Sequence, residues 1–494
     1  MKNTPSFCGA LVFGLALLVG CDGSITDPGD LSNRDYEVWL VDQSDSPGKA
    51  FGGTLYIYPK SAVAAAAGVS VGTPAKIDLG DAVSALCLAS TGANPVRPHM
   101  LMFNSTSSHA VLAFVASGHV VILDAEARTP ITCLRASVGF NGGRQAHAAT
   151  PAPDDSYILV ANQNGKLLER ITTNYATNQF SFDAAATLDL TSCTTPSGAS
   201  CQSVDLRPDN APIVPAITST SALAFVTLRG GGLLVVDPKA TPMRIRAEYD
   251  KATIKGSGLM GMQIGNDVVV NSGAGFFAYR VSPGAVAATN AVNTPAPTSL
   301  IADVVTTRDS HGMTATPDGR FVWITDRGTN VAEVFEVSSG SRTTVSFASS
   351  LSSDPAPDLA DISPAGDLLF VALRGPVPLS GGAIATGSTP GLGIMKVTGS
   401  GNTGVLEAIL RISNLDGTTE RADAHAIRVR LKPTVTATHT VLMRLAQLVR
   451  PPELQAYQPP PAGAQSRLPS VARPNGNGAV DKPQECDHGI ALVR

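Results

Sequence analysis

The sequence predicts an all-β fold, and within that class a seven-bladed β-propeller. Three observations carry this prediction. Gly (47) and Pro (35) together account for about one residue in six of the 494, a frequency typical of short strands joined by tight turns. Charged residues make up only 15%, against about 25% in average soluble proteins. One strand-and-turn unit also recurs seven times between residues 38 and 369.

The charge balance excludes several classes of protein. The chain carries 36 basic and 40 acidic side chains, which gives a formal net charge of −4. So few charges argue against a coiled coil, whose flanks are charged, and against a charge-rich disordered chain. The sequence has no basic stripe that could neutralise phosphates, so nucleic acid is not an expected partner.

The first 20 residues have the features of a secretory signal. A single Lys2 precedes an apolar run over residues 10–20, which is too short to span a bilayer as a lasting anchor. The run ends at Leu18-Val19-Gly20-Cys21, which resembles the lipobox of bacterial lipoproteins. The resemblance implies that Cys21 is lipidated, that residues 21–35 are a polar tether, and that lipid holds the protein to a membrane of the bacterial cell envelope, facing the periplasm or the exterior. The alternative is an ordinary signal peptide that ends near a cysteine.

Five cysteines remain once the signal and Cys21 are set aside, and an oxidising compartment favours disulfides between them. Cys193 and Cys201, eight residues apart in a segment rich in Thr, Ser and Gly, are the predicted disulfide. Cys87 with Cys133 is a second pairing that we consider, and it leaves Cys486 unpaired. The motif CxxCH does not occur, which excludes covalently attached c-type haem.

The repeated unit is clearest over residues 309–337. It reads as a strand, a turn at Pro317-Asp318-Gly319, a second strand over 321–325, another turn, and a third strand that ends near residue 337. A mean step of about 55 residues leaves room for four short strands, the unit of a propeller blade. Weaker copies of the second strand begin at Val38, Leu112, Ile158, Ala224, Asp267 and Leu369, and third strands are expected over 53–58, 118–124 and 232–237.

Residues 311–337 resemble the YVTN-type propeller repeat, whose group includes lactonase-like propellers and those of amine dehydrogenases and nitrite reductases. The alternatives are an array of β-sandwiches or two smaller β domains. A final related stretch, residues 425–431 followed by 440–445, either closes the ring or forms an eighth blade. We favour seven blades over residues 36–449, because a ring closed by this stretch leaves no exposed edge strand. Residues 450–494 are rich in Pro and Gly and are expected to form a disordered tail.

Four side chains occupy matched positions in the first strands. His147, His311 and Asp358 each lie eleven residues before a copy of the second strand, and His425 opens the final copy. First strands line the axis of a propeller, so we expect an axial cluster. Imidazole and carboxylate ligands suit a divalent transition metal. The competing interpretation is that these histidines hydrogen-bond the backbone of neighbouring blades, since His147 and His311 would face each other across the axis rather than share an ion.

Other histidines and arginines have less specific expected roles. His99, His109, His119 and His439 are scattered and are expected to be structural. Three arginines, Arg229, Arg327 and Arg374, follow the second strand at matched places. They could form a basic ring for an anionic ligand, or they could brace neighbouring blades through carboxylates such as Asp326 or Asp361. We favour bracing.

The sequence names no reaction. It contains no GxSxG, HExxH or P-loop motif. We therefore expect a lipid-anchored propeller that binds a protein or a small ligand on one face, where inserts at 281–299 and 376–393 would emerge. One alternative is a lactonase-like or metal-dependent enzyme that uses the axial histidines. Another is an accessory subunit of a periplasmic dehydrogenase complex, whose cofactor lies in a second chain.

Overall fold

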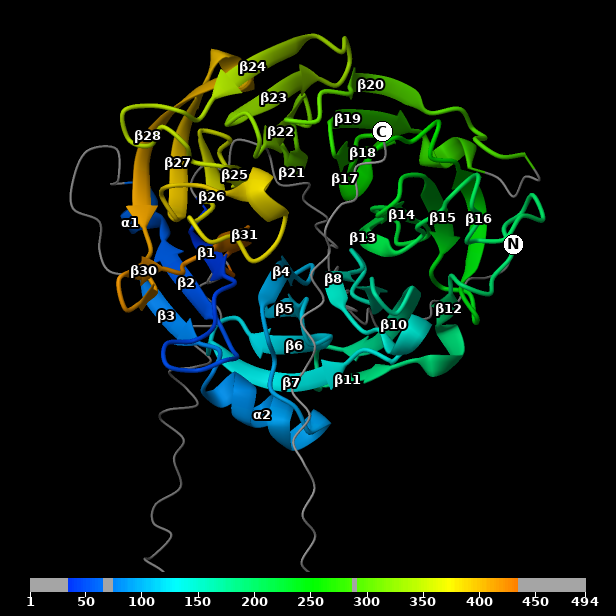
Figure 1. The fold of residues 1–494 in the computed structure, drawn as a ribbon, viewed down its shortest axis with the longest axis horizontal. Helices are drawn as coiled ribbons and strands as arrows, with labels where there is room; N and C mark the ends of the chain where they lie inside the picture. The colour runs from blue at the N-terminus through cyan, green and yellow to red at the C-terminus, as the bar shows by residue number, and fades with distance from the viewer. Residues whose placement is uncertain (1–33, 65–73, 287–290, 434–494) are drawn as a thin grey trace, which may run out of the picture. The chain divides into compact units, whose positions relative to one another are not determined.

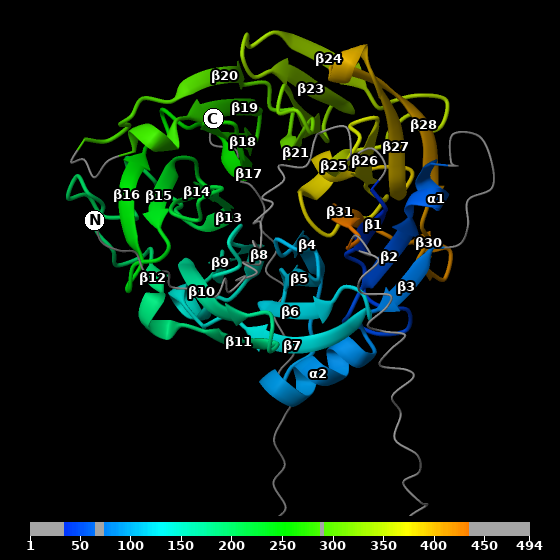
Figure 2. The same cartoon turned by 180° about the vertical axis from the view of Figure 1, so that it is seen from behind.

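Seven antiparallel sheets are arranged as blades around one axis, as Figure 1 shows from one face and Figure 2 from the other. The computed structural model describes residues 34–64, 74–286 and 291–433. In each blade, four strands pair side by side from the axis outward. The predicted seven-bladed β-propeller is confirmed.

Each blade contributes one strand to each of four positions between the axis and the rim. The innermost strands, in the order of the blades around the ring, are β31 (Ala424–Leu431), β4 (Pro98–Phe103), β8 (Ala146–Pro151), β13 (Pro212–Ile217), β17 (Ser257–Ile264), β21 (Ser310–Ala315) and β25 (Pro357–Ile362). The second strands, in the same order, are β1 (Tyr36–Asp42), β5 (His109–Phe114), β9 (Tyr157–Asn162), β14 (Ala224–Leu228), β18 (Asp267–Gly273), β22 (Phe321–Asp326) and β26 (Leu368–Leu373). The third strands are β2 (Thr54–Pro59), β6 (His119–Asp124), β10 (Leu167–Asn174), β15 (Leu233–Asp237), β19 (Phe276–Val281), β23 (Val331–Glu336) and β27 (Gly391–Thr398). The outer strands are β3 (Ala75–Asp78), β7 (Thr129–Arg135), β11 (Gln179–Phe182), β16 (Arg244–Tyr249), β20 (Thr298–Asp303), β24 (Arg342–Ser346) and β28 (Thr403–Arg411).

Few other elements decorate the ring. The short strand β12 (Leu188–Asp189) pairs with β10, and β29 (Leu415–Asp416) forms a hairpin with β30 (Thr419–Glu420). The α-helices of the described residues are α1 (Lys60–Ala64) and α2 (Ala82–Thr91). Neither of them has the length and apolar character needed to cross a membrane.

The second strands are the most deeply buried elements, which explains why they carry the sequence signal. Every residue of β1, β5, β9 and β22 is buried, because each face of a blade packs against the neighbouring blade. The turn between β21 and β22 uses Gly319 at φ +67°, a conformation that glycine adopts without strain. All seven predicted copies coincide with second strands.

The ring is closed by the last described strand. β31 pairs antiparallel with β1, with Tyr36 opposite Leu431 and Glu37 opposite Arg430. The innermost strand of this blade therefore comes from the C-terminal side of the chain and its other three strands from the N-terminal side. The predicted closure by residues 425–431 is confirmed, and residues 440–445 lie outside the described residues.

Every innermost strand carries a β-bulge near its start. The pairing with the second strand shifts register between Pro98 and Leu101 in β4 and between Ser310 and Met313 in β21. Equivalent shifts occur in β8, β13, β17 and β25, and in the pairing of β31 with β1. A bulge re-aims the side chain that it contains. Seven matched residues are therefore released from the regular alternation of the strand.

Two disulfides are present. Cys193 is bonded to Cys201, the pairing expected from the spacing, and Cys87 is bonded to Cys133. Cys87 belongs to α2 and Cys133 to β7, so the second bond holds the helix against the outer strand of its blade.

We expect the two disulfides to stabilise the protein unequally. A cross-link restricts the unfolded chain more when it spans more residues, so the separation of 46 at Cys87–Cys133 is worth about 4 kcal/mol and the separation of 8 at Cys193–Cys201 about 2.5 kcal/mol. Replacing Cys87 and Cys133 together by Ala should lower the urea midpoint of unfolding further than the same change at Cys193 and Cys201. Equal midpoints, or the reverse order, would contradict this expectation.

Candidate functional site

The seven bulges place a ring of matched residues at the axis. From the blade of β31 onward these residues are His425, His99, His147, Ile213, Leu259, His311 and Asp358. Matched hydrogen bonds support the equivalence, because Thr227 Oγ1 donates to the carbonyl of Leu259 and Thr325 Oγ1 to that of Asp358. Five consecutive blades thus contribute an imidazole or a carboxylate, and the other two contribute aliphatic side chains.

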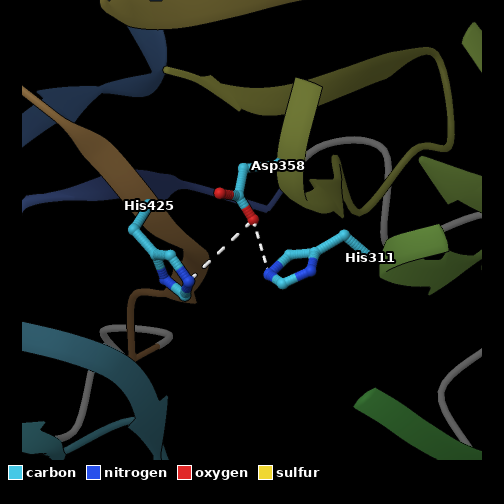
Figure 3. A group of neighbouring side chains, drawn as sticks. All are labelled: His311, Asp358 and His425. Carbon is cyan, nitrogen blue, oxygen red and sulfur yellow. Dashed lines mark ion pairs between the residues drawn. The ribbon is translucent and has the colours of Figure 1, made fainter. Parts of the chain in front are cut away.

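Three of these side chains form a compact group, drawn in Figure 3. His311 Nε2 lies 2.9 Å from Asp358 Oδ1, and His425 Nε2 lies 3.9 Å from the same oxygen. One ligand atom from each residue lies within 4.8 Å of the others. The three residues come from β21, β25 and β31, so they meet only because the ring is closed. The structure therefore brings together three of the four predicted axial residues.

Several atoms of this group have no hydrogen-bond partner among the described residues. They are both ring nitrogens of His425 and Nδ1 of His311, whereas Asp358 Oδ1 has His311 Nε2 as its close neighbour. Asp358 is fully buried and His425 is 1% exposed. A buried polar atom without a partner costs about 1–3 kcal/mol. The cluster is thus built at a cost in stability, which points to a ligand.

The remaining predicted residue, His147, joins the cluster through His99, which is expected from the sequence to have only a structural role. His99 stacks on His425 with ring centroids 3.8 Å apart, and His147 contacts His99 with centroids 4.6 Å apart. His311 lies edge-on to His425 at 5.6 Å. Four imidazoles and one carboxylate therefore form a continuous arc around the axis.

The predicted copy of the second strand in the blade of His99 begins two residues too late, and this places His99 outside the matched positions. Ala110 pairs with Phe103 as Ile158 pairs with Pro151 and Val322 with Ala315. The equivalent of Ile158 is therefore Ala110 rather than Leu112. Eleven residues before Ala110 is His99, so the same offset would have found it.

Burial lowers the pKa values of the four histidines in the arc, which favours their neutral forms. It lowers the pKa of His311, lowers that of His147 to about 4, and holds those of His99 and His425 well below their usual range. Burial opposes ionisation of Asp358, but the surrounding imidazoles and the guanidinium groups of Arg374 and Arg327 more than reverse this and lower its pKa. Neutral imidazoles beside an ionised carboxylate are the forms in which these groups bind metals.

Two of the three matched arginines hold the buried carboxylates in place. Arg327 Nε donates to Asp309 at 2.8 Å, and its Nη1 lies 3.5 Å from Asp358. Arg374 contacts Asp358 and donates through Nε to Asp423 at 2.6 Å. The result is a buried ladder that runs Asp309–Arg327–Asp358–Arg374–Asp423 across three blades.

Arg327 and Arg374 brace neighbouring blades, as predicted. The predicted partners, Asp326 and Asp361, are wrong. Asp326 accepts a hydrogen bond from Arg308 instead, and Asp361 accepts the backbone N–H of Val429. Arg229 has no contact with the buried carboxylates of the ladder among the ion pairs of the described residues. It pairs with Asp209 and is substantially exposed, so the three arginines do not converge on one ligand.

The two ends of the axis differ. Beside the ladder, the insert after β26 folds inward, where Leu379 N–H donates to Asp423 and the carbonyl of Ser380 accepts from Arg374. Part of the expected rim insert therefore covers buried charges. Further along the same strands lies a cavity of about 340 Å³, whose lining includes Met102, Thr150, Met260, Met262 and Arg428. Cys21, the predicted lipidation site, lies outside the described residues.

The fold has known counterparts among solved structures. No protein-family model and no curated protein matches the chain. The chain is similar to a putative 6-phosphogluconolactonase from Bacteroides fragilis, at 13% identity and a TM-score of 0.51, covering 81% of this chain and 98% of that one. It is also similar to a protein from Lactobacillus plantarum, at 12% identity and a TM-score of 0.50, covering 80% and 99%. At these identities the likeness concerns the propeller fold alone, and in that respect the expected resemblance to lactonase-like propellers holds.

We expect Arg374→Met to destabilise the protein by about 3–5 kcal/mol, because it leaves Asp358 and Asp423 as uncompensated buried charges. Arg229→Met is the matched control, since Arg229 occupies the same place in the repeat but forms an exposed ion pair, which is worth at most about 1 kcal/mol. Free energies of unfolding from urea titrations check both values. Similar losses in the two variants would show that the ladder is not a special feature of the axis.

Proposed function

We propose that the chain is a lipid-anchored, extracytoplasmic binding propeller whose ligand is a divalent transition-metal ion, held on the axis by His311, Asp358 and His425. One observation carries the proposal. Three buried residues each offer a ligand atom of metal-binding chemistry within 4.8 Å of the others. Both ring nitrogens of His425 and Nδ1 of His311 have no hydrogen-bond partner in the part of the chain that the structure describes.

The donor set fits a metal ion better than a hydrogen-bonding role. Two imidazoles and one carboxylate suit zinc and non-haem iron, with coordination positions left open for water or a further ligand. Tetrahedral ligands at about 2.0–2.1 Å from an ion lie about 3.3 Å apart. His311 and Asp358 are already as close as this, so a small rotation of His425 completes the set. Arg374 and Arg327 would orient Asp358 from behind, as outer partners of metal ligands do.

The competing role, hydrogen bonding to the backbone of a neighbouring blade, fits one of the histidines and not another. It fits His147, whose Nδ1 lies 3.0 Å from the carbonyl oxygen of Ile213 in the next blade. It does not fit His425, because neither ring nitrogen of that residue has a partner among the described residues. A residue kept for hydrogen bonding would use at least one of its nitrogens. His425 therefore gives the sharpest test.

Placement in the cell envelope is supported by the sequence before Cys21 and by the two disulfides. Disulfides persist in oxidising compartments such as the periplasm and the cell exterior. A metal-binding propeller tethered there would meet its ion outside the cytoplasm. The lipid would hold the ring near a membrane without a spanning segment.

We expect His425→Phe to abolish metal binding at this group while leaving the metal-free protein as stable as before. Phenylalanine keeps a ring to stack on His99 and removes two buried nitrogens that lack partners. Loss of a direct ligand should weaken affinity by more than about 100-fold, the upper range for loss of an outer partner. Calorimetric titration with Zn²⁺ and elemental analysis, on protein purified without an affinity tag, measure this.

His109→Phe serves as the control for that variant, because His109 lies on β5 and has its own partners, Ser108 and Asn178. It should leave metal content unchanged. If His425→Phe strongly destabilises the metal-free protein and leaves its metal content intact, His425 is structural and the proposed metal site is wrong.

We also expect Cys21→Ser to move the protein from the membrane fraction to the soluble extracytoplasmic fraction. The hydroxyl of serine cannot form the thioether that attaches lipid to a lipobox cysteine. Fractionation of cells, with mass spectrometry of the N-terminal peptide, reads out both position and modification. An unmodified peptide in the unsubstituted protein would overturn lipid anchoring and leave a simple secretory signal.

A further inference from the structure

His99 and His147 form a second pair of imidazoles on the arc, separate from the three residues of the proposed metal site. Their Nε2 atoms lie 3.2 Å apart. At that distance one nitrogen can donate a hydrogen bond to the other only if it carries a proton. The partners of the Nδ1 atoms decide where each proton lies.

The proton of neutral His99 is fixed on Nδ1 by Gln43. His99 Nδ1 lies 2.9 Å from Gln43 Oε1. The Gln43 amide is itself oriented, because its Nε2 faces Asp423 and Ser380. Asp423 already accepts from Arg374 and Leu379, so a flipped amide would set oxygen against a carboxylate. Gln43 therefore accepts, His99 Nδ1 donates, and His99 Nε2 carries a lone pair.

The proton of neutral His147 is fixed in the same way. Its Nδ1 lies 3.0 Å from the carbonyl oxygen of Ile213. A backbone carbonyl only accepts hydrogen bonds. His147 Nδ1 therefore carries the proton, and His147 Nε2 also presents a lone pair.

Two lone pairs thus face each other at 3.2 Å inside the protein. This contact is repulsive for a pair of neutral imidazoles. It becomes favourable when a positive charge sits between or beside the two nitrogens. Both Nε2 atoms can therefore bind a cation through their lone pairs. Each Nδ1–H donates a hydrogen bond to an oxygen, as in most metal-binding histidines.

We propose that His99 and His147 hold a second divalent transition-metal ion through their Nε2 atoms, beside the ion at His311, Asp358 and His425. The spacing matches, because two imidazole nitrogens bound to one tetrahedral ion at about 2.0–2.1 Å lie about 3.3 Å apart. This second site rests on the proposed function, because it assumes that the protein takes up metal. Its two ligands, His99 and His147, are not ligands of the first site.

One ligand of the second site is partly exposed, and a cavity lies further along the same strands. His147 is partly exposed, unlike His99 and His425. The cavity of about 340 Å³ is lined by Met102, Thr150 and Arg428, each three residues beyond His99, His147 or His425 on its own strand. The thioethers of Met102, Met260 and Met262 add soft donors along the same cavity.

The test compares metal stoichiometry in His147→Asn, His425→Phe and the unsubstituted protein, with Zn²⁺ and Co²⁺ as probes. The amide nitrogen of asparagine can take the place of Nδ1 and keep the hydrogen bond to Ile213, while Nε2 is lost. We expect two ions in the unsubstituted protein and one in each variant, with Co²⁺ giving the intense visible bands of tetrahedral coordination. His109→Asn is the matched control and should bind two ions, and thermal melts verify that all variants fold.

The outcomes separate this inference from the proposed function. Two ions in His147→Asn would overturn the second site. A single ion that is lost only in His147→Asn would support the second site and overturn the first. A single ion lost only in His425→Phe, or lost in both variants, would overturn a separate second site. No ion in the unsubstituted protein would overturn both.

Discussion

The contact between Asp358 and Arg374 is the constraint on which the axis depends. Both side chains are fully buried, and the removal of two charges from water costs several kcal/mol for each ion before their attraction is counted. The ladder spreads this cost over five side chains from Asp309 to Asp423. It keeps Asp358 ionised and oriented beside neutral imidazoles. The imidazoles of His311 and His425, together with Arg374 and Arg327, hold the pKa of Asp358 well below its usual range although burial opposes this.

The β-bulges determine which side chains reach the axis, and the ladder of ion pairs fixes the charge of one of them, Asp358. In a regular strand, consecutive side chains alternate between the two faces, and a blade buries both faces against its neighbours. The bulge releases one residue per innermost strand from this alternation and aims it at the axis. Seven blades therefore offer seven matched positions. This chain fills five of them with His or Asp and leaves Ile213 and Leu259 on one side, so the polar arc is confined to the other side.

The fold was predictable from the sequence because its signal is local and repeated. Turns such as Pro317-Asp318-Gly319 and wholly buried second strands recur at similar intervals along the chain. If one copy is placed two residues too late, the predicted number of blades stays the same. The site was predictable only where the same offset held. The offset of eleven residues predicts His147, His311 and Asp358. It does not predict His99, because the second-strand copy in that blade is predicted to begin at Leu112 and its true equivalent is Ala110.

Long-range contacts could not be predicted in the same way. Asp423 braces Arg374 from 49 residues away, and the insert after β26 turns inward to meet it. Nothing local in the sequence distinguishes these partners from Asp326 or Asp361, which stand nearer to the arginines in the repeat. The partners of Arg327 and Arg374 depend on how neighbouring blades meet. That arrangement is a property of the closed ring rather than of any single repeat.

Closure of the ring also determines when the axial site comes into existence. Arg430 on β31 pairs with Glu37 on β1 across 393 positions of the chain, and β31 is the strand that carries His425. During synthesis or export from the N-terminus, His311 and Asp358 emerge well before His425 does. The three-ligand group is complete only after nearly the whole propeller has emerged. For an exported chain this order would postpone binding of the proposed ion until after translocation, so that ion would be taken from the compartment in which the ring closes.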